Sequence, residues 1–339
     1  MPGDPHTPRD LPAPRERHTA TRLRDGRVLI AGGENLEVQV DGAFVLGTNG
    51  DRWAHVEFEG RLEHDAILLD DDRVMLVGGL SLRGPAATPR IFDPEGDDFA
   101  SAAPLNDERT LQSTLLLEDG RVFVCGGRSE QGVMQLADLW DPRTNTWTAA
   151  ADMITDRFSH CTVRLADGRV LAVGGRNDGG ALASAEVYDP RENKWSAAGE
   201  HAESRRDFSM NVLRDGRVLV AGGWTDEENG PLDTAVLWDP RRARFSPPVP
   251  LSAPRFDHPA IGLPDGRVAL IGGWDPETET AASVDVFDPR SGAFSPGAPL
   301  ADGRYGHSAT LLLDGRVLVA GGFSQRVGAS LASVETWTP

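Results

Sequence analysis

Cysteine, tyrosine and long apolar runs are all scarce in this chain of 339 residues. Its two cysteines, Cys125 and Cys161, are too few for a disulfide framework and fit a reducing compartment. No apolar run approaches the roughly 20 residues that a helix needs to cross a bilayer, and residues 1–20 lack the apolar centre of a secretory signal. These absences predict a cytoplasmic protein that has no membrane partner.

Positive charge is also in short supply. The chain carries 34 Lys and Arg against 52 Asp and Glu, so its formal net charge is −18. The long-range field of such a protein repels polyanions, which argues against nucleic acid or an anionic membrane as the main partner. The spacing of a long amphipathic helix is missing too, whereas 38 glycines and 24 prolines are typical of short strands joined by turns.

What the chain has instead is a sevenfold repeat. A diglycine closes an apolar run seven times, at intervals of 46 to 50 residues. Asp-Gly-Arg precedes six of the diglycines, and Asp71-Asp72-Arg73 takes its place in the second repeat. A period of this length indicates one repeat architecture rather than two independent domains. The diglycines are Gly32-Gly33, Gly78-Gly79, Gly126-Gly127, Gly174-Gly175, Gly222-Gly223, Gly272-Gly273 and Gly321-Gly322.

Each repeat predicts four short strands. In the fourth repeat these are residues 160–165, 169–175 and 183–189, followed by a strand that carries Trp195. A four-stranded unit cannot bury both of its faces alone, so the units must pack around a common axis. We therefore predict a single all-β domain over residues 1–339, a seven-bladed β-propeller. Its repeats begin near residues 15, 61, 109, 157, 205, 255 and 304.

The repeat resembles the kelch motif, which has a diglycine after an apolar strand, an aromatic residue on the third strand and then a spaced tryptophan. The resemblance covers essentially the whole chain and implies a kelch-type propeller. Kelch propellers include adaptors, lectin-like binders and a few enzymes, so the resemblance does not imply one function. The last repeat lacks a fourth strand, and Leu11 precedes Arg15 by four residues as Met153 precedes Arg157. We therefore expect an N-terminal strand, about residues 5–11, to complete the last blade and remove a free sheet edge.

An arginine precedes the first strand of every repeat. This strand is innermost in a propeller, so we expect the seven side chains to ring one mouth of the central channel. A guanidinium group matches carboxylate or phosphate, and in kelch adaptors that capture acidic peptides the arginines at the matching position contact the ligand. The ring predicts an anionic ligand; the competing interpretation is that each arginine bridges blades through backbone carbonyls or carboxylates. The arginines are Arg15, Arg61, Arg109, Arg157, Arg205, Arg255 and Arg304.

The loops that follow the diglycines frame the same mouth, and their first residues vary from repeat to repeat. Trp224, Trp274 and Phe323 predict an apolar wall on the last three blades, with Arg128 and Arg176 as a basic wall opposite. Positions that vary on a repeated scaffold are where specificity for a ligand can be built. We expect all five side chains to contact the ligand.

Five of the eight histidines share one position, three residues after the arginine. They suggest an alternative, an enzyme that holds a transition metal or performs acid–base chemistry at this mouth. Galactose-oxidase-like propellers share the kelch repeat and place copper ligands near this position, but their radical chemistry needs tyrosines that this chain lacks there. The competing interpretation is a ring of buried, satisfied histidines. The metal candidates are His18, His64, His160, His258 and His307, and the catalytic candidates are His64, His160, Asp257, His258 and His307.

Three functions therefore remain open. The preferred one is a binding module without a cofactor, whose partner is an anionic small molecule, an acidic sugar or an acidic peptide. The second is a small-molecule enzyme that uses the histidine ring, and the third is a protein–protein scaffold that uses the rim alone. We expect the chain to be a monomer.

Overall fold

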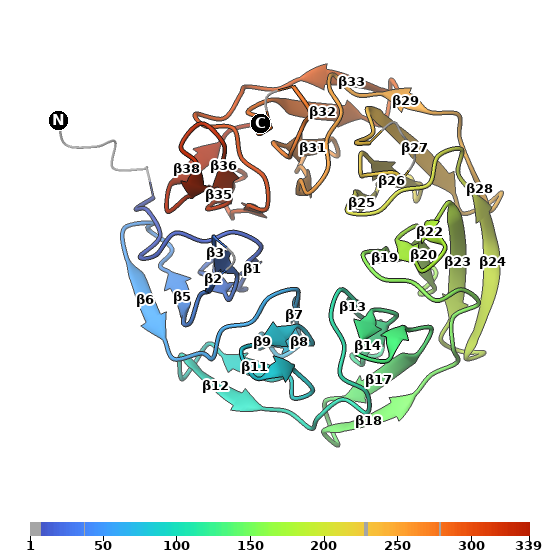
Figure 1. The fold of residues 1–339 in the computed structure, drawn as a ribbon, viewed down its shortest axis with the longest axis horizontal. Coiled ribbons are helices and arrows are strands. Elements are labelled where there is room, and N and C mark those ends of the chain that lie inside the picture. The colour runs from blue at the N-terminus through green and yellow to red at the C-terminus, as the bar shows by residue number, and fades with distance from the viewer. Residues whose placement is uncertain (1–7, 37, 227–229, 278) are drawn as a thin grey trace.

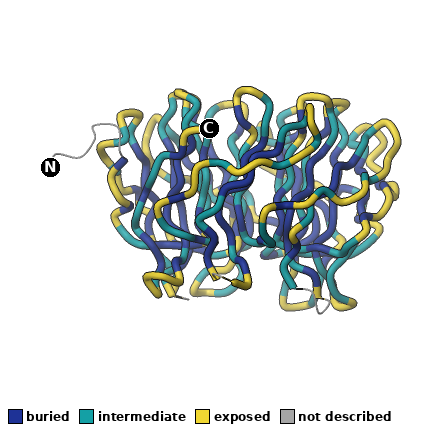
Figure 2. The backbone as a smooth tube through the Cα atoms, turned by 90° about the horizontal axis from the view of Figure 1, so that it is seen from above, coloured by how far each residue is buried: buried dark blue, intermediate teal, exposed yellow. Residues whose placement is uncertain are grey.

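The computed structural model describes residues 8–36, 38–226, 230–277 and 279–339. In this part of the chain the strands are short, and they form seven small sheets around a central axis (Figure 1). Exposed turns gather at the two ends of the ring, and the buried strand segments lie between them (Figure 2). None of the described residues forms a helix that could span a bilayer. The predicted all-β, seven-bladed propeller is confirmed.

Each blade is an antiparallel sheet whose innermost strand comes first in the sequence. Blade 1 contains β1 (Thr19–Arg22), β2 (Val28–Ala31), β5 (Ala43–Leu46) and β6 (Trp53–Val56). Blade 2 contains β7 (Asp65–Leu68), β8 (Val74–Val77), β11 (Arg90–Asp93) and β12 (Asp98–Ser101). Blade 3 contains β13 (Ser113–Leu116), β14 (Val122–Cys125), β17 (Ala137–Asp141) and β18 (Thr146–Ala149). Blade 4 contains β19 (Cys161–Arg164), β20 (Val170–Val173), β23 (Ser184–Asp189) and β24 (Lys194–Glu200).

The last three blades vary this plan. Blade 5 contains β25 (Ser209–Val212), β26 (Val218–Ala221), β27 (Thr234–Asp239), β28 (Arg244–Phe245) and β29 (Val249–Pro250), and both β28 and β29 pair with β27. Blade 6 contains β30 (Ala260–Gly262), β31 (Val268–Ile271), β32 (Val284–Asp288) and β33 (Ala293–Pro296). Within the described ranges, blade 7 has three strands, β34 (Ser308–Leu311), β35 (Val317–Ala320) and β38 (Val334–Trp337).

Small hairpins follow the diglycines of five blades. We call the end of the ring that carries them the mouth face; the chain also re-enters each innermost strand at this end. In blades 5 and 6, Trp224 and Trp274 form isolated β-bridges at the equivalent place. The hairpins are β3 (Glu34–Asn35) with β4 (Val38–Gln39), β9 (Leu80–Ser81) with β10 (Gly84–Pro85), β15 (Arg128–Ser129) with β16 (Gly132–Val133), β21 (Arg176–Asn177) with β22 (Gly180–Ala181), and β36 (Phe323–Ser324) with β37 (Ala329–Ser330).

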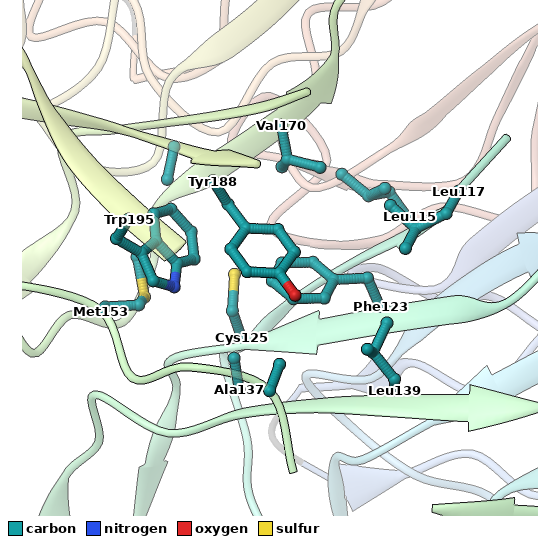
Figure 3. Close-up of a cluster of buried hydrophobic side chains, with 12 residues drawn as sticks. Leu115, Leu117, Phe123, Cys125, Ala137, Leu139, Met153, Val170, Tyr188 and Trp195 are labelled. Carbon is teal, nitrogen blue, oxygen red and sulfur yellow. The ribbon is translucent and has the colours of Figure 1, made fainter. Parts of the chain in front are cut away.

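The hydrophobic core is divided among the seven seams between neighbouring blades. The second strand of each blade is buried along its whole length because a sheet covers each of its faces, which explains its continuous apolar run. In the seam between blades 3 and 4, Phe123 stacks on Tyr188 with ring centroids 4.6 Å apart, beside Cys125 and Trp195 (Figure 3). Both cysteines are unpaired thiols; Cys125 is fully buried, which fits a packing role.

The diglycines join one blade to the next. The amide of the second glycine donates to the carbonyl of the arginine that opens the following blade; for example, Gly175 N lies 2.9 Å from Arg205 O. The first glycine has a positive φ, and a Cβ on Gly174 would lie 2.5 Å from the same carbonyl and 2.9 Å from the ring of Phe208. Only glycine fits this approach without displacing the next blade. The same contact to the arginine carbonyl recurs at all seven diglycines.

The N-terminal segment closes the ring at the seam between blades 7 and 1. Leu11 is buried there among side chains of both blades, its amide donates to Ala332 O at 2.7 Å, and Asp10 accepts a bond from the Val334 amide. These contacts place the segment beside the last blade, as expected. Residues 8–11 nevertheless form no strand, and residues 5–7 lie outside the described residues.

Candidate functional site

The seven arginines at the start of the repeats lie inside the blades. Each side chain is at most 5 % exposed. In every blade the Nη1 atom donates to the carbonyl of that blade's own first glycine, at 2.6 to 3.5 Å. The backbone carbonyl of each arginine therefore binds the preceding blade, and its guanidinium group binds the blade to which the arginine belongs. We call this pair of contacts the arginine latch.

Carboxylates on the third strand complete the latch in four blades. Arg157 Nη2 lies 2.6 Å from Glu186 Oε1, and the other carboxylate oxygen accepts the backbone amide of Ile154. In blade 5, Val236 occupies the position of the acid, and Glu203 from the preceding loop pairs with Arg205 instead. In blades 1 and 2 the guanidinium lies over a phenylalanine ring. The four pairs are Arg109–Asp138, Arg157–Glu186, Arg255–Asp285 and Arg304–Glu335.

These contacts correct the expectation of an open arginine ring. The guanidinium groups of Arg15, Arg61, Arg109, Arg157, Arg205, Arg255 and Arg304 are buried and bonded to carbonyls, carboxylates or aromatic faces of the blades. A ligand at the mouth face does not meet them. The competing interpretation, in which each arginine bridges blades, describes their geometry.

The five histidines also belong to the seams. His64 Nε2 lies 3.0 Å from Thr19 Oγ1 of the preceding blade, and His258 Nε2 lies 3.0 Å from Ser209 Oγ. Burial, with the neighbouring arginine, lowers the pKa of both rings to about 3, so the imidazoles are neutral. His18 and His160 have the same lowered pKa, and that of His307 is also well below its usual value.

The histidine ring does not fit a metal. Each ring lies on a different blade, and the Nε2 atoms of His18, His64 and His258 are bonded to hydroxyl groups and that of His160 to a thiol. No group of three or more His, Cys, Asp or Glu residues in the described ranges could hold a metal ion. Asp257 and His258 do not act as a pair, because the carboxylate turns to Arg17 and the imidazole to Ser209.

A second ring of residues lies closer to the axis on the mouth face. These residues follow the latch arginines by two positions, all have φ between 51° and 61°, and backbone bonds link them from blade to blade. For example, Asp257 N donates to Asp207 O at 3.1 Å, and Ser159 N donates to Leu111 O at 3.0 Å. The members of this axial ring are Arg17, Glu63, Leu111, Ser159, Asp207, Asp257 and Gly306.

Aromatic side chains adjoin the axial ring over blades 5 to 7. Trp224, Phe256 and Trp274 form one cluster with ring centroids 5.1 to 5.8 Å apart, and each residue is partly exposed. Phe323 pairs with Tyr305 at 5.6 Å. The loop aromatics predicted from the sequence therefore lie on one side of the mouth face, where Phe256 and Tyr305 pack against them.

Charged side chains form ion pairs beside the aromatic residues and the axial ring. Arg17 lies 3.0 Å from Glu34 and 3.7 Å from Asp257, while Arg206 pairs with Asp207 and approaches Asp226 at 3.5 Å. Burial raises the pKa of Asp257, and Asp207 and Glu34 raise it further against the effect of Arg17. Burial also raises the pKa of Glu16. Negative charge is thus crowded at this end of the axis.

The two arginines of the expected basic wall differ in their surroundings. Arg176 pairs with Asp226 at 3.3 Å. Arg128 is exposed and lies over the ring of Phe158 at 5.5 Å, and within the described ranges no carboxylate pairs with it. A recess of about 640 Å³ between blades 2 and 3 is lined in part by Asp107, Glu108 and Asp156. The basic wall is therefore partly neutralised and bordered by acids.

Sequence reasoning missed Arg17, Glu34, Asp207 and Arg206 as members of the site. The axial-ring position was visible as the residue two positions after each repeat arginine, and it holds six different residue types in the seven repeats. Its placement on the axis depends on the left-handed backbone, which brings these residues into contact across the blades.

Comparison with known proteins supports the repeat and the fold. The kelch motif matches residues 119–154 and 157–200, which span most of blade 3 and all of blade 4. No curated protein matches the sequence. Among solved structures, a fungal alcohol oxidase of the AA5 family, in complex with copper, aligns with a TM-score of 0.77 and 18 % identity over 98 % of this chain and 75 % of that chain. At this identity the likeness concerns the fold alone.

Proposed function

Because this chain is a kelch-repeat β-propeller, we propose that it is a binding module whose ligand site lies around the axis of the mouth face. The supporting observation is that the cluster of Trp224, Phe256 and Trp274 adjoins two axial-ring carboxylates. Asp257 follows Phe256 in the chain, and Arg206, which pairs with Asp207, lies over Trp224 at 5.9 Å. We call these five residues, Asp207, Trp224, Phe256, Asp257 and Trp274, the axial patch.

The chemistry of the axial patch favours a ligand with a ring or apolar face and a cationic or hydrogen-bond-donating group. Partly exposed indole rings offer faces for stacking and for cation–π contact. Carboxylates outnumber guanidinium groups around the patch, so an added positive charge is attracted and an added negative charge is repelled. The carboxylates are Glu16, Glu34, Asp207, Asp226 and Asp257, and the guanidinium groups are Arg17, Arg176 and Arg206.

An anionic small molecule or acidic peptide remains the second candidate ligand. The seven latch arginines are not available to it, so it depends on Arg128, which is exposed and has no carboxylate partner in the described part of the chain. Arg176 contributes less because Asp226 already neutralises it. The sign of the ligand charge therefore separates the two candidates.

Three fragments that share one ring but differ in charge test this proposal. Benzylammonium, benzyl alcohol and benzoate are compared by saturation-transfer NMR on the full chain. We expect the strongest transfer to benzylammonium and the weakest to benzoate, and we expect Trp274→Ala to reduce the benzylammonium signal several-fold. Asp257→Asn should reduce it as well.

Arg128→Ala is the matched control, since it removes a charged side chain from the mouth face outside the axial patch. It should leave the benzylammonium signal unchanged. A benzoate signal that exceeds the other two and disappears in Arg128→Ala would establish the anionic ligand instead. Equal signals from all three fragments that survive Trp274→Ala would overturn the axial site.

A further inference from the structure

A second surface on the mouth face is apolar and exposed. Among the residues that the structure describes, five of the eight exposed large hydrophobic ones lie on the hairpins of three neighbouring blades, 7, 1 and 2 (Figure 1). Isolated apolar residues on a surface are ordinary, but a gathering of them beside polar groups marks an interaction site. We call this set the aliphatic arc: Leu36, Val38, Leu80, Leu82 and Val327.

An acidic segment runs between the hairpins of blades 1 and 2. Residues 57–63 cross the mouth face from the outer strand of blade 1 toward the axis, and their side chains alternate between exposed and buried up to Gly60. Glu57, Glu59 and Glu63 are exposed, whereas Phe58 is buried in the seam. The face that these residues show to solvent is therefore a row of carboxylates.

Backbone contacts hold this acidic segment between the two halves of the arc. On the blade 1 side, Gly42 N donates to Phe58 O at 2.9 Å. On the blade 2 side, Leu62 and Leu80 exchange two backbone bonds of 2.8 and 2.9 Å. The hairpin of blade 1, which carries Leu36 and Val38, therefore lies on one side of the acidic segment, and the hairpin of blade 2, which carries Leu80 and Leu82, lies on the other.

The charge of this surface is mostly unbalanced. Arg83 pairs with Glu59 at 3.4 Å. Among the described residues, the one ion-pair contact of Glu57 is with His55 at 3.9 Å, and no ion pair engages Glu63. A partner that covers the arc must bring positive charge to the middle and apolar side chains to both edges, because an acidic partner would bury like charges together.

We propose that the aliphatic arc and the acidic segment dock a segment of a partner protein that carries Lys or Arg flanked by aliphatic residues. This surface lies outside the axial patch and does not depend on it. The equivalent loops of blades 3 to 6 carry Arg128, Arg176, Trp224 and Trp274 in place of exposed aliphatic residues, so the arc is a feature of one sector of the ring.

Selection of random peptides displayed on phage against the immobilised full-length protein tests this proposal. We expect the enriched peptides to place Lys or Arg beside Leu, Ile or Val. Val38→Ser combined with Leu82→Ser should weaken the binding of the synthesised peptides by about tenfold. Glu57→Gln combined with Glu63→Gln should weaken it by about threefold and reduce its salt dependence.

Ile154→Ser is the matched control, because Ile154 is an exposed aliphatic residue, 58 % accessible, that lies outside the arc. It should change the peptide affinity by less than about twofold. Failure to enrich peptides, or enriched peptides whose affinity is unaffected by the serine pair, would overturn the docking surface. Retention of the benzylammonium signal in the serine pair would show that such a failure concerns the arc and not the axial site.

Discussion

At the scale of single residues, one side-chain type serves two different purposes in this molecule. Latch arginines such as Arg157 are buried, and both Nη atoms of Arg157 donate hydrogen bonds to its own blade. Arginines of the mouth face such as Arg17 and Arg128 are exposed and face solvent or neighbouring loops. The two groups differ in how deeply their side chains are buried. We therefore expect substitutions of the latch arginines to affect stability and substitutions of the mouth-face arginines to affect binding.

Arg157→Ala should destabilise the fold strongly, since it leaves Glu186 buried and without its counter-ion. The expected loss in the free energy of unfolding is about 3–5 kcal/mol, measured by chemical denaturation. Arg143→Ala breaks an ion pair of the same kind at the surface, with Asp141 at 3.0 Å. We expect the denaturation midpoint of that control to change little. Equal losses of stability in the two variants would show that the buried latch pair contributes no more to stability than an exposed ion pair.

Asp65 predicts a pH dependence of stability. Burial raises the pKa of the Asp65 carboxyl to about 7, although Thr114 and Gln112 act to lower it. Its Oδ2 atom is buried without a hydrogen-bond partner. Because the folded state binds the proton more tightly than the unfolded state, this contribution to stability is complete below about pH 4 and is lost as the pH rises to about 7.

Asp65→Asn should remove that dependence. Relative to the wild type, the variant should gain roughly 4 kcal/mol in the free energy of unfolding between about pH 4 and pH 8. Denaturation curves at the two pH values measure the gain. A difference between the two proteins that stays constant with pH would contradict the raised pKa of Asp65.

At the scale of elements, the diglycine ends the second strand and attaches it to the next blade. Gly174 has φ +59° and faces the Arg205 carbonyl, whereas Gly292 has φ +70° and no atom within 4 Å of an added Cβ. Gly174→Ala should therefore lower the melting temperature much more than Gly292→Ala, because both carry the strain of a positive φ but only the first displaces a blade. Similar melting temperatures for the two variants would show that backbone strain alone explains the diglycine.

The hairpins are the elements that the repeat leaves free to vary. Each latch arginine is followed by a residue that bridges to the first residue after the diglycine of its blade, such as Phe256 to Trp274 and Tyr305 to Phe323. This bridge keeps the root of the loop after each diglycine in the same place while the side chains differ. The scaffold therefore presents a different surface on each blade while it keeps the position of this bridge.

At the scale of the whole molecule, the architecture was predictable from the repeat period, and the role of the arginines was not. Seven diglycines at nearly constant spacing are sufficient for a seven-bladed ring. The pattern around Arg157 does not say whether its guanidinium faces solvent, because its partner Glu186 lies 29 residues further along the chain. In four repeats an Asp or Glu follows the arginine by 29 to 31 residues. This spacing is the sequence signal from which the buried ion pairs could have been predicted.

The location of the candidate site was partly predictable for a similar reason. Trp224, Trp274 and Phe323 stood out in the sequence because they break a repeated pattern. In the structure Trp224 and Trp274 pack with Phe256, and Phe323 packs with Tyr305. The crowding of carboxylates near them was not predictable, since it depends on the axial ring and on contacts between blades far apart in sequence.

The central claim is that ligands are recognised by the axial patch rather than by the arginines of the repeat. The most direct measurement is a titration of the full chain with benzylammonium, observed through its tryptophan indole N–H signals by NMR and assigned with Trp→Phe variants. The account predicts that the signals of Trp224 and Trp274 shift while those of the blade residues Trp147 and Trp195 stay in place. It is contradicted if benzylammonium leaves Trp224 and Trp274 unmoved.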